Sequence, residues 1–326
     1  MKKKILIIGG AGYVGSSLVP FLLEKNYKIY VFDLFIYGNI FKEHKNLRII
    51  KGDIRDIKFL NEIVEKIDIL IHLACISNDP SFELNPNLGK SINFDCFEPL
   101  VEISKKNKIK RFVYASSSSV YGVKSEPNVN ELVDLNPLTD YSYYKAECEK
   151  VLINYQDNDF IGTIVRPATV CGYAPRQRLD VVVNLLTNLA YNKREMTVFG
   201  GDQLRPNIHI LDMVRVYYEI IKSPEKTISK QIFNAGIENK TVNEIANSVK
   251  KIVGDDVKIH KKPTDDNRSY HIDSSKIKKI LNFEFKYSVE DAIIHLLDAY
   301  QKNLLTNSLT NENYFNIKKM QNINLK

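Results

Sequence analysis

No stretch of this sequence reaches the roughly 20 consecutive apolar residues that a membrane-spanning helix requires. The amino-terminal residues MKKKILIIGG pass directly from a basic start into a strand pattern, without a signal-type cleavage site. Both absences argue against a membrane partner and against secretion. They predict a cytoplasmic protein.

Cysteine is scarce, with four residues and no Cys-x-x-Cys pair. Cys75, Cys96, Cys148 and Cys171 lie inside apolar or helical patterns, so we expect reduced, mostly buried thiols. Neither a disulfide nor a metal site is indicated.

Positive charge is modest, at +7 for 326 residues, and part of it lies in residues 2–4 and in the Lys/Asn-rich tail after residue 303. A nucleic-acid-binding protein normally gathers more positive charge on one surface. We therefore expect no nucleic-acid partner. An anionic small substrate fits the charge equally well.

Short β-branched runs alternate with amphipathic helical stretches over the first half of the chain. Strands are expected at six runs: KILIIG, KIYVFD, LRIIKGD, DILIHLA, RFVYASS and FIGTIVRP. Helices are expected from about Tyr13, near 56–66, over 87–106, and from Asp140 as N-cap to Tyr155. The alternation predicts an α/β fold with a doubly wound parallel sheet.

A glycine-rich segment, GGAGYVG, places Gly9, Gly12 and Gly15 between the first strand and the first helix. Glycines there permit a tight turn and a close approach of the backbone to a pyrophosphate at the helix N-terminus. Asp33 ends the second strand about 20 residues later, as in Rossmann-type dinucleotide sites. Its carboxylate would accept hydrogen bonds from the adenosine ribose and repel a 2′-phosphate. The following LFIYGNI has no Arg or Lys, so NAD is predicted rather than NADP.

Further cofactor contacts are expected from the same loop and from two later strand ends. GDIRD places Asp53 on the adenine side, although a solvated turn residue is the alternative, and HLAC places the small Ala74 where the cofactor would run. With the loop residues, these additional contacts are Tyr13, Val14, Asp53, Ile54, Leu73 and Ala74.

The segment YSYYK carries the catalytic candidates. Tyr141 and Lys145 are four residues apart, so their side chains meet on one helix face, whereas Tyr143 and Tyr144 cannot reach Lys145 in this way. A tyrosine that acts as a base needs a pKa well below its reference value near 10. Lys145 and a nicotinamide cation are the expected causes of that lowering.

Two further motifs complete the set, the strand end SSSSVYG and the segment RPATVCGYAPR. With GGAGYVG, GDIRD, HLA and YSYYK they resemble the extended short-chain dehydrogenase/reductase family, in its UDP-glucose 4-epimerase-like branch of nucleoside-diphosphate-sugar epimerases and dehydratases. The resemblance extends to about residue 302. It implies an NAD-dependent enzyme that acts at C4 of a nucleoside-diphosphate sugar through a 4-keto intermediate.

The resemblance also implies roles for particular residues. Ser117, four positions before Tyr121, would hydrogen-bond the reacting hydroxyl and complete the catalytic set with Tyr141 and Lys145. Arg205, in GGDQLRPNIHILD, would pair with the substrate diphosphate. The expected substrate contacts are Ser117, Ser118, Thr169, Arg176, Arg178, Arg205 and Arg268.

Departures from the family pattern leave the reaction open. Family members that eliminate water carry Asp-Glu after the catalytic hydroxyl, where this chain has Ser118 and Ser119. UDP-galactose 4-epimerases have Asn at the position of Thr169, and Pro263 stands where a later Arg is expected, with Arg268 nearby. A C4 dehydrogenase or 4-keto reductase is therefore an alternative. A catalytically silent NAD sensor or RNA binder is a remote one.

The domain organisation is predicted from the change of pattern beyond Arg166. We expect an NAD-binding domain over 1–166 plus about 205–235, and a smaller mixed α/β substrate domain over 167–204 and 236–305. Residues 306–326 form a carboxyl-terminal tail of open function. The family resemblance implies a homodimer built from the helices near 87–106 and 140–157.

Overall fold

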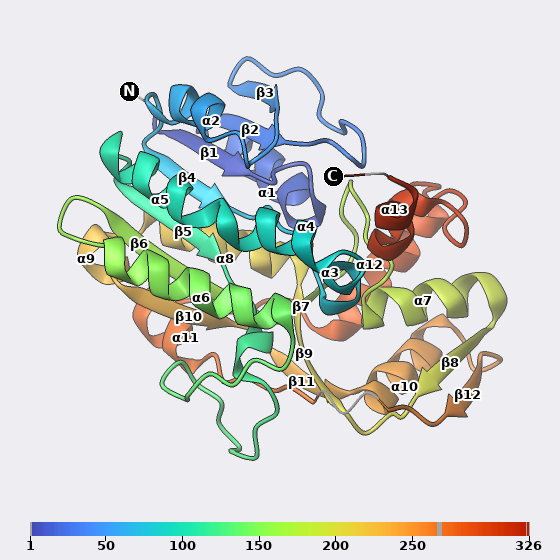
Figure 1. Ribbon diagram of the computed structural model, residues 1–326. Coiled ribbons are helices and arrows are strands. Elements are labelled where there is room, and N and C mark those ends of the chain that lie inside the picture. The colour runs from blue at the N-terminus through green and yellow to red at the C-terminus, as the bar shows by residue number, and fades with distance from the viewer. Residues whose placement is uncertain (1, 266–268, 324, 326) are drawn as a thin grey trace.

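The largest sheet has seven parallel strands in the order β10-β6-β5-β4-β1-β2-β3, as the computed structural model shows for residues 2–265, 269–323 and 325 (Figure 1). All six strands expected from the sequence are present, and β10 is added. The strands are β1 (Lys4–Ile8), β2 (Lys28–Asp33), β3 (Leu47–Lys51), β4 (Ile69–His72), β5 (Arg111–Ala115), β6 (Ile161–Pro167) and β10 (Gln231–Ala235). Every neighbouring pair is parallel, which confirms the doubly wound Rossmann-type architecture.

Two hydrophobic cores lie on the two faces of this sheet. In β1, Ile5 and Ile7 belong to one core and Leu6 and Ile8 to the other, because successive strand side chains point to opposite faces. The first core is covered by α1 (Tyr13–Glu24), α8 (Ile210–Lys222) and α11 (Ser275–Leu281). The second is covered by α2 (Ile57–Val64), α5 (Phe97–Lys106) and α6 (Asp140–Tyr155). Covering helices on both faces bury the central strands, whereas the edge strand β3 stays partly exposed.

The helix expected over 87–106 is present, but it is not a uniform α-helix. The chain forms α3 (Asp79–Glu83), α4 (Pro86–Lys90), a π-helical turn (Ser91–Asp95) and then α5. Pro99 has no N–H to donate to the carbonyl of Asp95, and its ring crowds that carbonyl, so the helix widens before it.

The predicted N-cap of α6 is also corrected by one residue. Thr139, not Asp140, is the cap: its hydroxyl accepts from the backbone N–H of Ser142, and the Ser142 hydroxyl accepts from the backbone N–H of Thr139. This reciprocal pair satisfies two amide donors that a lone Asp140 cap would not.

The carboxyl-terminal half adds two smaller sheets and a third core. β7 (Thr169–Cys171), β9 (Leu204–His209) and β11 (Glu238–Thr241) form one sheet, and β8 (Glu195–Phe199) pairs with β12 (Lys258–Lys262). Helices α7 (Val182–Lys193), α10 (Val242–Val253) and α12 (Val289–Gln301) enclose the core between them. The short α9 (Glu225–Ile228) precedes β10, and α13 (Asn316–Asn322) ends the described chain. The domain boundaries stay a prediction.

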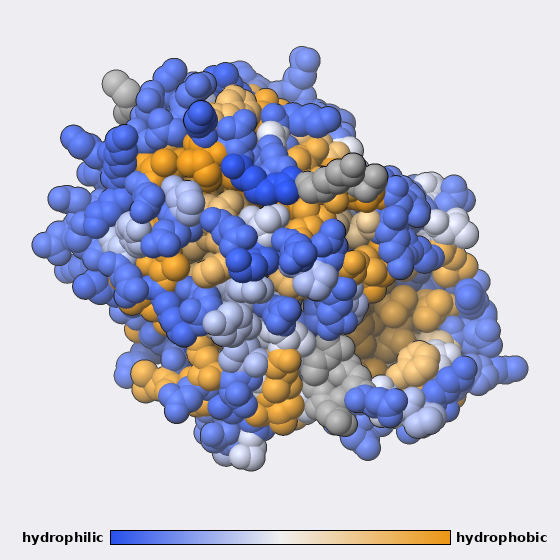
Figure 2. Space-filling view, in the orientation of Figure 1, coloured by the Kyte–Doolittle hydropathy of each residue, from blue (hydrophilic) through white to orange (hydrophobic). Residues whose placement is uncertain are grey.

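Within the described residues, no helix combines the length and the apolar character needed to cross a membrane. Figure 2 shows the surface hollowed beside α7, where apolar side chains line the depression.

Candidate active site

A cavity of about 520 Å³ lies at the carboxyl ends of the parallel strands, where the strand order reverses beside β1. Doubly wound sheets bind ligands at this edge. Most of the residues predicted for the site line this cavity, and they are Gly9, Gly12, Tyr13, Val14, Gly15, Asp33, Ile54, Leu73, Ala74, Ser117, Ser118, Tyr141, Lys145, Thr169, Arg176, Arg178 and Arg205. The prediction for Arg268 lies outside the described residues.

The glycine-rich loop wraps tightly around the end of β1. Gly9 has φ +79°, and a Cβ on it would lie 2.4 Å from the backbone nitrogen of Ala74. A Cβ on Gly15 would lie 2.3 Å from the carbonyl oxygen of Gly10. Gly12 caps α1 without a side chain, so the first amide groups of the helix face the cavity. This cradle fits a pyrophosphate, which helix N-termini bind through backbone N–H groups.

The two acidic residues predicted for the cofactor side behave differently. Asp33 lines the cavity and accepts hydrogen bonds from the backbone nitrogens of Ala11 (3.0 Å) and Phe35 (2.8 Å). Burial raises the pKa of Asp33, while these hydrogen bonds act in the opposite direction. Asp53 does not line the cavity in the described part of the chain. Its carboxylate pairs with Arg55, 2.6 Å away, which lowers the pKa of Asp53, and the adjacent Ile54 lines the cavity instead.

Helix α6 brings the catalytic candidates to the end of β5. The Lys145 Nζ donates to the carbonyl oxygen of Ala115 (2.7 Å) and lies 5.9 Å from the centre of the Tyr141 ring, so the two side chains share one helix face as expected. Ser117 lines the cavity with Tyr141, and its side chain acts to lower the Tyr141 pKa. Tyr144 stacks on Phe94 with ring centres 5.1 Å apart, on another face of the helix.

The pKa of Tyr141 departs from the expectation. Burial raises it well above its usual value, and the nearby Cys75 and Asp79 act in the same direction. The groups that lower it are Arg178 and Ser117. Arg178 lies 37 positions after Tyr141 in the chain, and no spacing rule connects the two. Sequence reasoning therefore assigned this electrostatic effect to Lys145 and the nicotinamide cation, and not to Arg178.

A buried ionic network fixes the position of α6. Glu149, four residues beyond Lys145, pairs with Arg166 on β6 at 2.6 Å, and both side chains are almost fully buried. The Ser116 hydroxyl donates to the same carboxylate, and Arg166 donates to the Tyr121 hydroxyl at 2.7 Å. Sequence reasoning missed this network, although Glu149 continues the four-residue spacing of Tyr141 and Lys145.

Three of the predicted substrate contacts, Arg178, Arg205 and Thr169, come from the carboxyl-terminal half of the chain and line the cavity. The Arg178 Nε donates to Asp180 (2.6 Å) and its Nη1 to the Ser77 hydroxyl (3.1 Å). The Arg205 guanidinium lies 5.9 Å from the centre of the Tyr270 ring. Thr169 lines the cavity at the beginning of β7.

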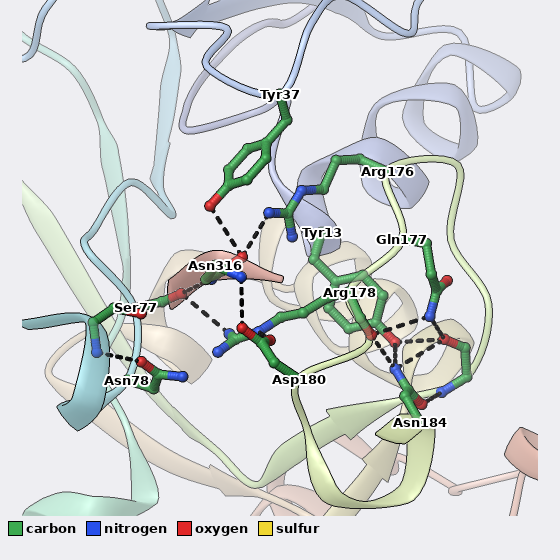
Figure 3. A network of polar contacts seen from close by, with 12 residues as sticks. Tyr13, Tyr37, Ser77, Asn78, Arg176, Gln177, Arg178, Asp180, Asn184 and Asn316 are labelled. Carbon is green, nitrogen blue, oxygen red and sulfur yellow. Dashed lines mark hydrogen bonds and ion pairs between the residues drawn. The ribbon is translucent and has the colours of Figure 1, made fainter. Parts of the chain in front are cut away.

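Tyr37 and the carboxyl-terminal tail line the cavity with residues that no sequence motif predicted. Asn316, Met320 and Leu325 line the cavity, and Asn316 hydrogen-bonds Tyr37 and Arg176 (Figure 3). The Arg176 guanidinium lies 3.4 Å from the centre of the Tyr37 ring. Arg176 thus brings a positive charge to the segment LFIYGNI after Asp33, a segment that itself contains no Arg or Lys.

Comparison with known proteins identifies a family for this chain. The model of the NAD dependent epimerase/dehydratase family matches residues 5–236. UDP-glucose 4-epimerase of Lactobacillus helveticus is 27% identical over 89% of this chain and 94% of its own length. dTDP-D-glucose 4,6-dehydratase of Dictyostelium discoideum is 31% identical over 74% of this chain and 60% of its own length.

Solved structures agree as well. UDP-glucose 4-epimerase of Thermotoga maritima with UDP-glucose has a TM-score of 0.84 at 26% identity, covering 92% of this chain and 99% of its own. UDP-glucuronic acid 4-epimerase of Bacillus cereus, in complex with UDP-glucuronic acid and NAD, has a TM-score of 0.82 at 27% identity and the same coverage. The matched family model spans the glycine-rich loop, the serine run and Tyr141, so the chain belongs to the NAD dependent epimerase/dehydratase family.

Proposed function

We propose that this chain is an NAD-dependent enzyme that inverts C4 of a nucleoside-diphosphate sugar through a 4-keto intermediate. One observation carries the proposal: Ser117, Tyr141 and Lys145 converge in the same cavity as the glycine-rich loop and Asp33. A redox reaction at a sugar hydroxyl requires a base for the hydroxyl proton beside the dinucleotide. This cavity contains both the candidate base, Tyr141, and the loop expected to bind the dinucleotide.

The cofactor side of the cavity suits NAD. The loop from Gly9 to Gly15 leaves room for a pyrophosphate against α1, and the Asp33 carboxylate lies at the end of β2, where the ribose hydroxyls can donate to it. The Lys145 ammonium uses one donor on Ala115, and its remaining N–H groups can hold the nicotinamide ribose. Bound NAD supplies a reversible acceptor for the hydride of C4.

The chain's own groups manage the proton. Tyr141, as the phenolate, takes the proton of the C4 hydroxyl, while Ser117 orients that hydroxyl through a hydrogen bond. Because burial raises the pKa of Tyr141, the positive charges of Arg178, Lys145 and the nicotinamide are needed to stabilise the phenolate. Arg178 contributes from the substrate side of the cavity.

Arg205 is proposed as the partner of the substrate diphosphate. A planar guanidinium binds phosphate oxygens in a two-pronged geometry, and Arg205 begins β9 at the cavity wall. Thr169 and Ser118 line the space between this arginine and Tyr141, where we place the sugar.

We also propose that water is not eliminated. Elimination needs an acid for the C6 hydroxyl and a base for the C5 proton, and the residues after Ser117 are serines. Two carboxylates of the wall, Asp79 and Asp180, are already engaged. The first accepts from Thr139, and the second pairs with Arg178 and accepts from the backbone of Asn316.

The test is a screen of UDP-, GDP-, CDP- and dTDP-hexoses and heptoses with the purified protein, read by mass spectrometry and by NMR at C4. A product of unchanged mass with inverted C4, absent with Tyr141→Phe, supports the proposal. A released 4-ketone with accumulation of NADH identifies a C4 dehydrogenase instead. Loss of 18 mass units identifies a dehydratase and contradicts the proposal, as does turnover by the Tyr141→Phe variant at the unaltered rate.

A further inference from the structure

The carboxyl-terminal segment Tyr314–Asn322 forms part of the cavity wall. The carbonyl oxygen of Tyr314 accepts from the backbone nitrogen of Leu179 (2.8 Å), and Met320 packs on the core of the α2–α6 face while lining the cavity. Figure 1 shows α13 at the edge of the sheet from which the cavity loops emerge. This segment lies beyond the family resemblance, which ends at about residue 302.

Asn316 connects three loops that surround the cavity, as Figure 3 shows. Its Oδ1 accepts from the Tyr37 hydroxyl (3.0 Å) and from the Arg176 Nη2 (2.6 Å). Its Nδ2 donates to the Ser77 hydroxyl (2.8 Å), and its backbone nitrogen donates to Asp180 (2.6 Å). The side chain is buried, so these contacts replace hydrogen bonds to water and fix the orientation of each partner.

Arg176 is the partner that makes no ion pair among the described residues. It is 5% exposed, and no carboxylate of the described residues lies within ion-pair distance of it. Its Nε is buried without a hydrogen-bond partner in the part of the chain that the structure describes. A buried guanidinium without an anion is costly, and burial lowers the pKa of Arg176 to about 10. The site is therefore suited to an anionic ligand.

The position of Arg176 indicates which anion this is. Its backbone nitrogen donates to the hydroxyl of Ser16, the residue after Gly15 in the glycine-rich loop (3.1 Å). Its guanidinium stacks on Tyr37, which follows Asp33 by four residues, and its charge acts on the Asp33 carboxylate. These neighbours belong to the cofactor side of the cavity, whereas Arg205 belongs to the substrate side. The nearest phosphates in that region are those of the dinucleotide.

We infer that Asn316 is a positioning residue for the cofactor: it holds Arg176 toward the pyrophosphate of NAD, and the segment Tyr314–Asn322 retains the bound dinucleotide. The inference rests on the placement of NAD in this cavity that is proposed above. It assigns a binding role to the tail for which the sequence had none.

The test replaces Asn316 by an aspartate of the same shape. The carboxylate of Asn316→Asp would pair with Arg176 and compete with the pyrophosphate. We expect the affinity for NAD and for ADP-ribose to fall on the order of 10-fold or more and NAD dissociation to accelerate, while the affinity for adenosine, which lacks phosphate, stays within about 2-fold. Gln321→Glu, an exposed residue of the same helix, introduces the same charge and should change neither affinity.

A second variant keeps the inference testable if Asn316→Asp is unstable. Arg176→Gln should show the same loss, confined to ligands that carry the pyrophosphate, and the double variant should lose little more than either single one. Unchanged ADP-ribose affinity in both variants would overturn the inference. So would a loss found only for UDP, which would assign Arg176 to the substrate diphosphate. Failure of the unaltered protein to bind NAD would instead refute the placement of the cofactor.

Discussion

Alanine substitutions at Ser116 and Ser117 should separate a structural hydroxyl from a catalytic one. The Ser116 hydroxyl donates to Glu149, which pairs with Arg166, and all three side chains are buried. Ser117 lines the cavity with Tyr141, and its side chain acts to lower the Tyr141 pKa. We therefore expect Ser116→Ala to lower the stability of the fold and Ser117→Ala to lower turnover.

The magnitudes follow from the contacts that each change removes. A hydrogen bond to a charged group contributes roughly 1.5–3 kcal/mol to stability. The Glu149 oxygen that loses Ser116 keeps the Arg166 Nε at 3.0 Å, so we expect the lower end of that range. For a chain of 326 residues the entropy of unfolding is roughly 0.7 kcal/mol/K, so a loss of about 1.5 kcal/mol lowers the melting temperature by roughly 2 °C. Loss of the hydroxyl that orients the substrate should cost on the order of 10²-fold in kcat, or about 2.7 kcal/mol of transition-state stabilisation.

The assay measures thermal unfolding, NAD binding and turnover for the same set of variants. Ser117→Ala should bind NAD normally and lose little melting temperature, because the hydroxyl gives up only neutral, part-buried hydrogen bonds with Ser119. Ser119→Ala is the matched control. Its hydroxyl lies 2.8 Å from the Ser117 hydroxyl and Ser119 also lines the cavity, but it is not assigned to the reacting hydroxyl, so its loss of turnover should be much smaller. Equal loss of turnover in all three variants would refute the assignment. An unchanged melting temperature for Ser116→Ala would refute the structural role.

Three further predictions concern the cofactor, the base and the assembly. Calorimetry should show tighter binding of NAD than of NADP. Asp33→Ala should weaken this preference, since the variant lacks the carboxylate that repels a 2′-phosphate. Tighter NADP binding by the unaltered protein would contradict the prediction. Because burial raises the pKa of Tyr141, kcat should rise from neutral toward alkaline pH. Arg178→Gln removes a cation that lowers this pKa and should shift the rise to higher pH. Coincident pH profiles of the two proteins would exclude this role of Arg178. Light scattering should report a homodimer at micromolar concentration, formed through α5 and α6, where the apolar Ile153 of α6 is 42% exposed. A monomer would rule out this assembly.

Local spacing determined much of the fold and of the cofactor side. The alternation of strand and helix patterns predicted six strands of the large sheet. This was possible because the spacing of apolar residues within one element depends only on which face of that element is buried. The glycine spacing of GGAGYVG predicted the tight loop, since Gly9 and Gly15 leave no room for a Cβ. Tyr141 and Lys145 meet because four residues make about one helical turn.

The helix details show where local rules compete. The expected helix over 87–106 gained a π-helical turn because Pro99 removes a backbone donor, and Thr139 became the cap of α6 because Ser142 returns the hydrogen bond. Asp53 had an equally local competitor, since Arg55, two residues later, takes its carboxylate away from the cavity. These signals were present in the sequence, but their balance depends on the packing around them.

Tertiary structure alone decided the charge and the walls of the site. Arg166 and Glu149 pair across 17 residues, and Asn316 reaches Arg176 across 140 and Tyr37 across 279. A pattern of period two or 3.6 reports which residues an element buries, not which distant side chain they meet. Local sequence therefore determined the cofactor loop, the individual strands and helices of the large sheet, and the Tyr141–Lys145 pair. Folding brought Arg178 to Tyr141 and Asn316 to Arg176, because such contacts depend on which loops the sheet topology gathers at one edge.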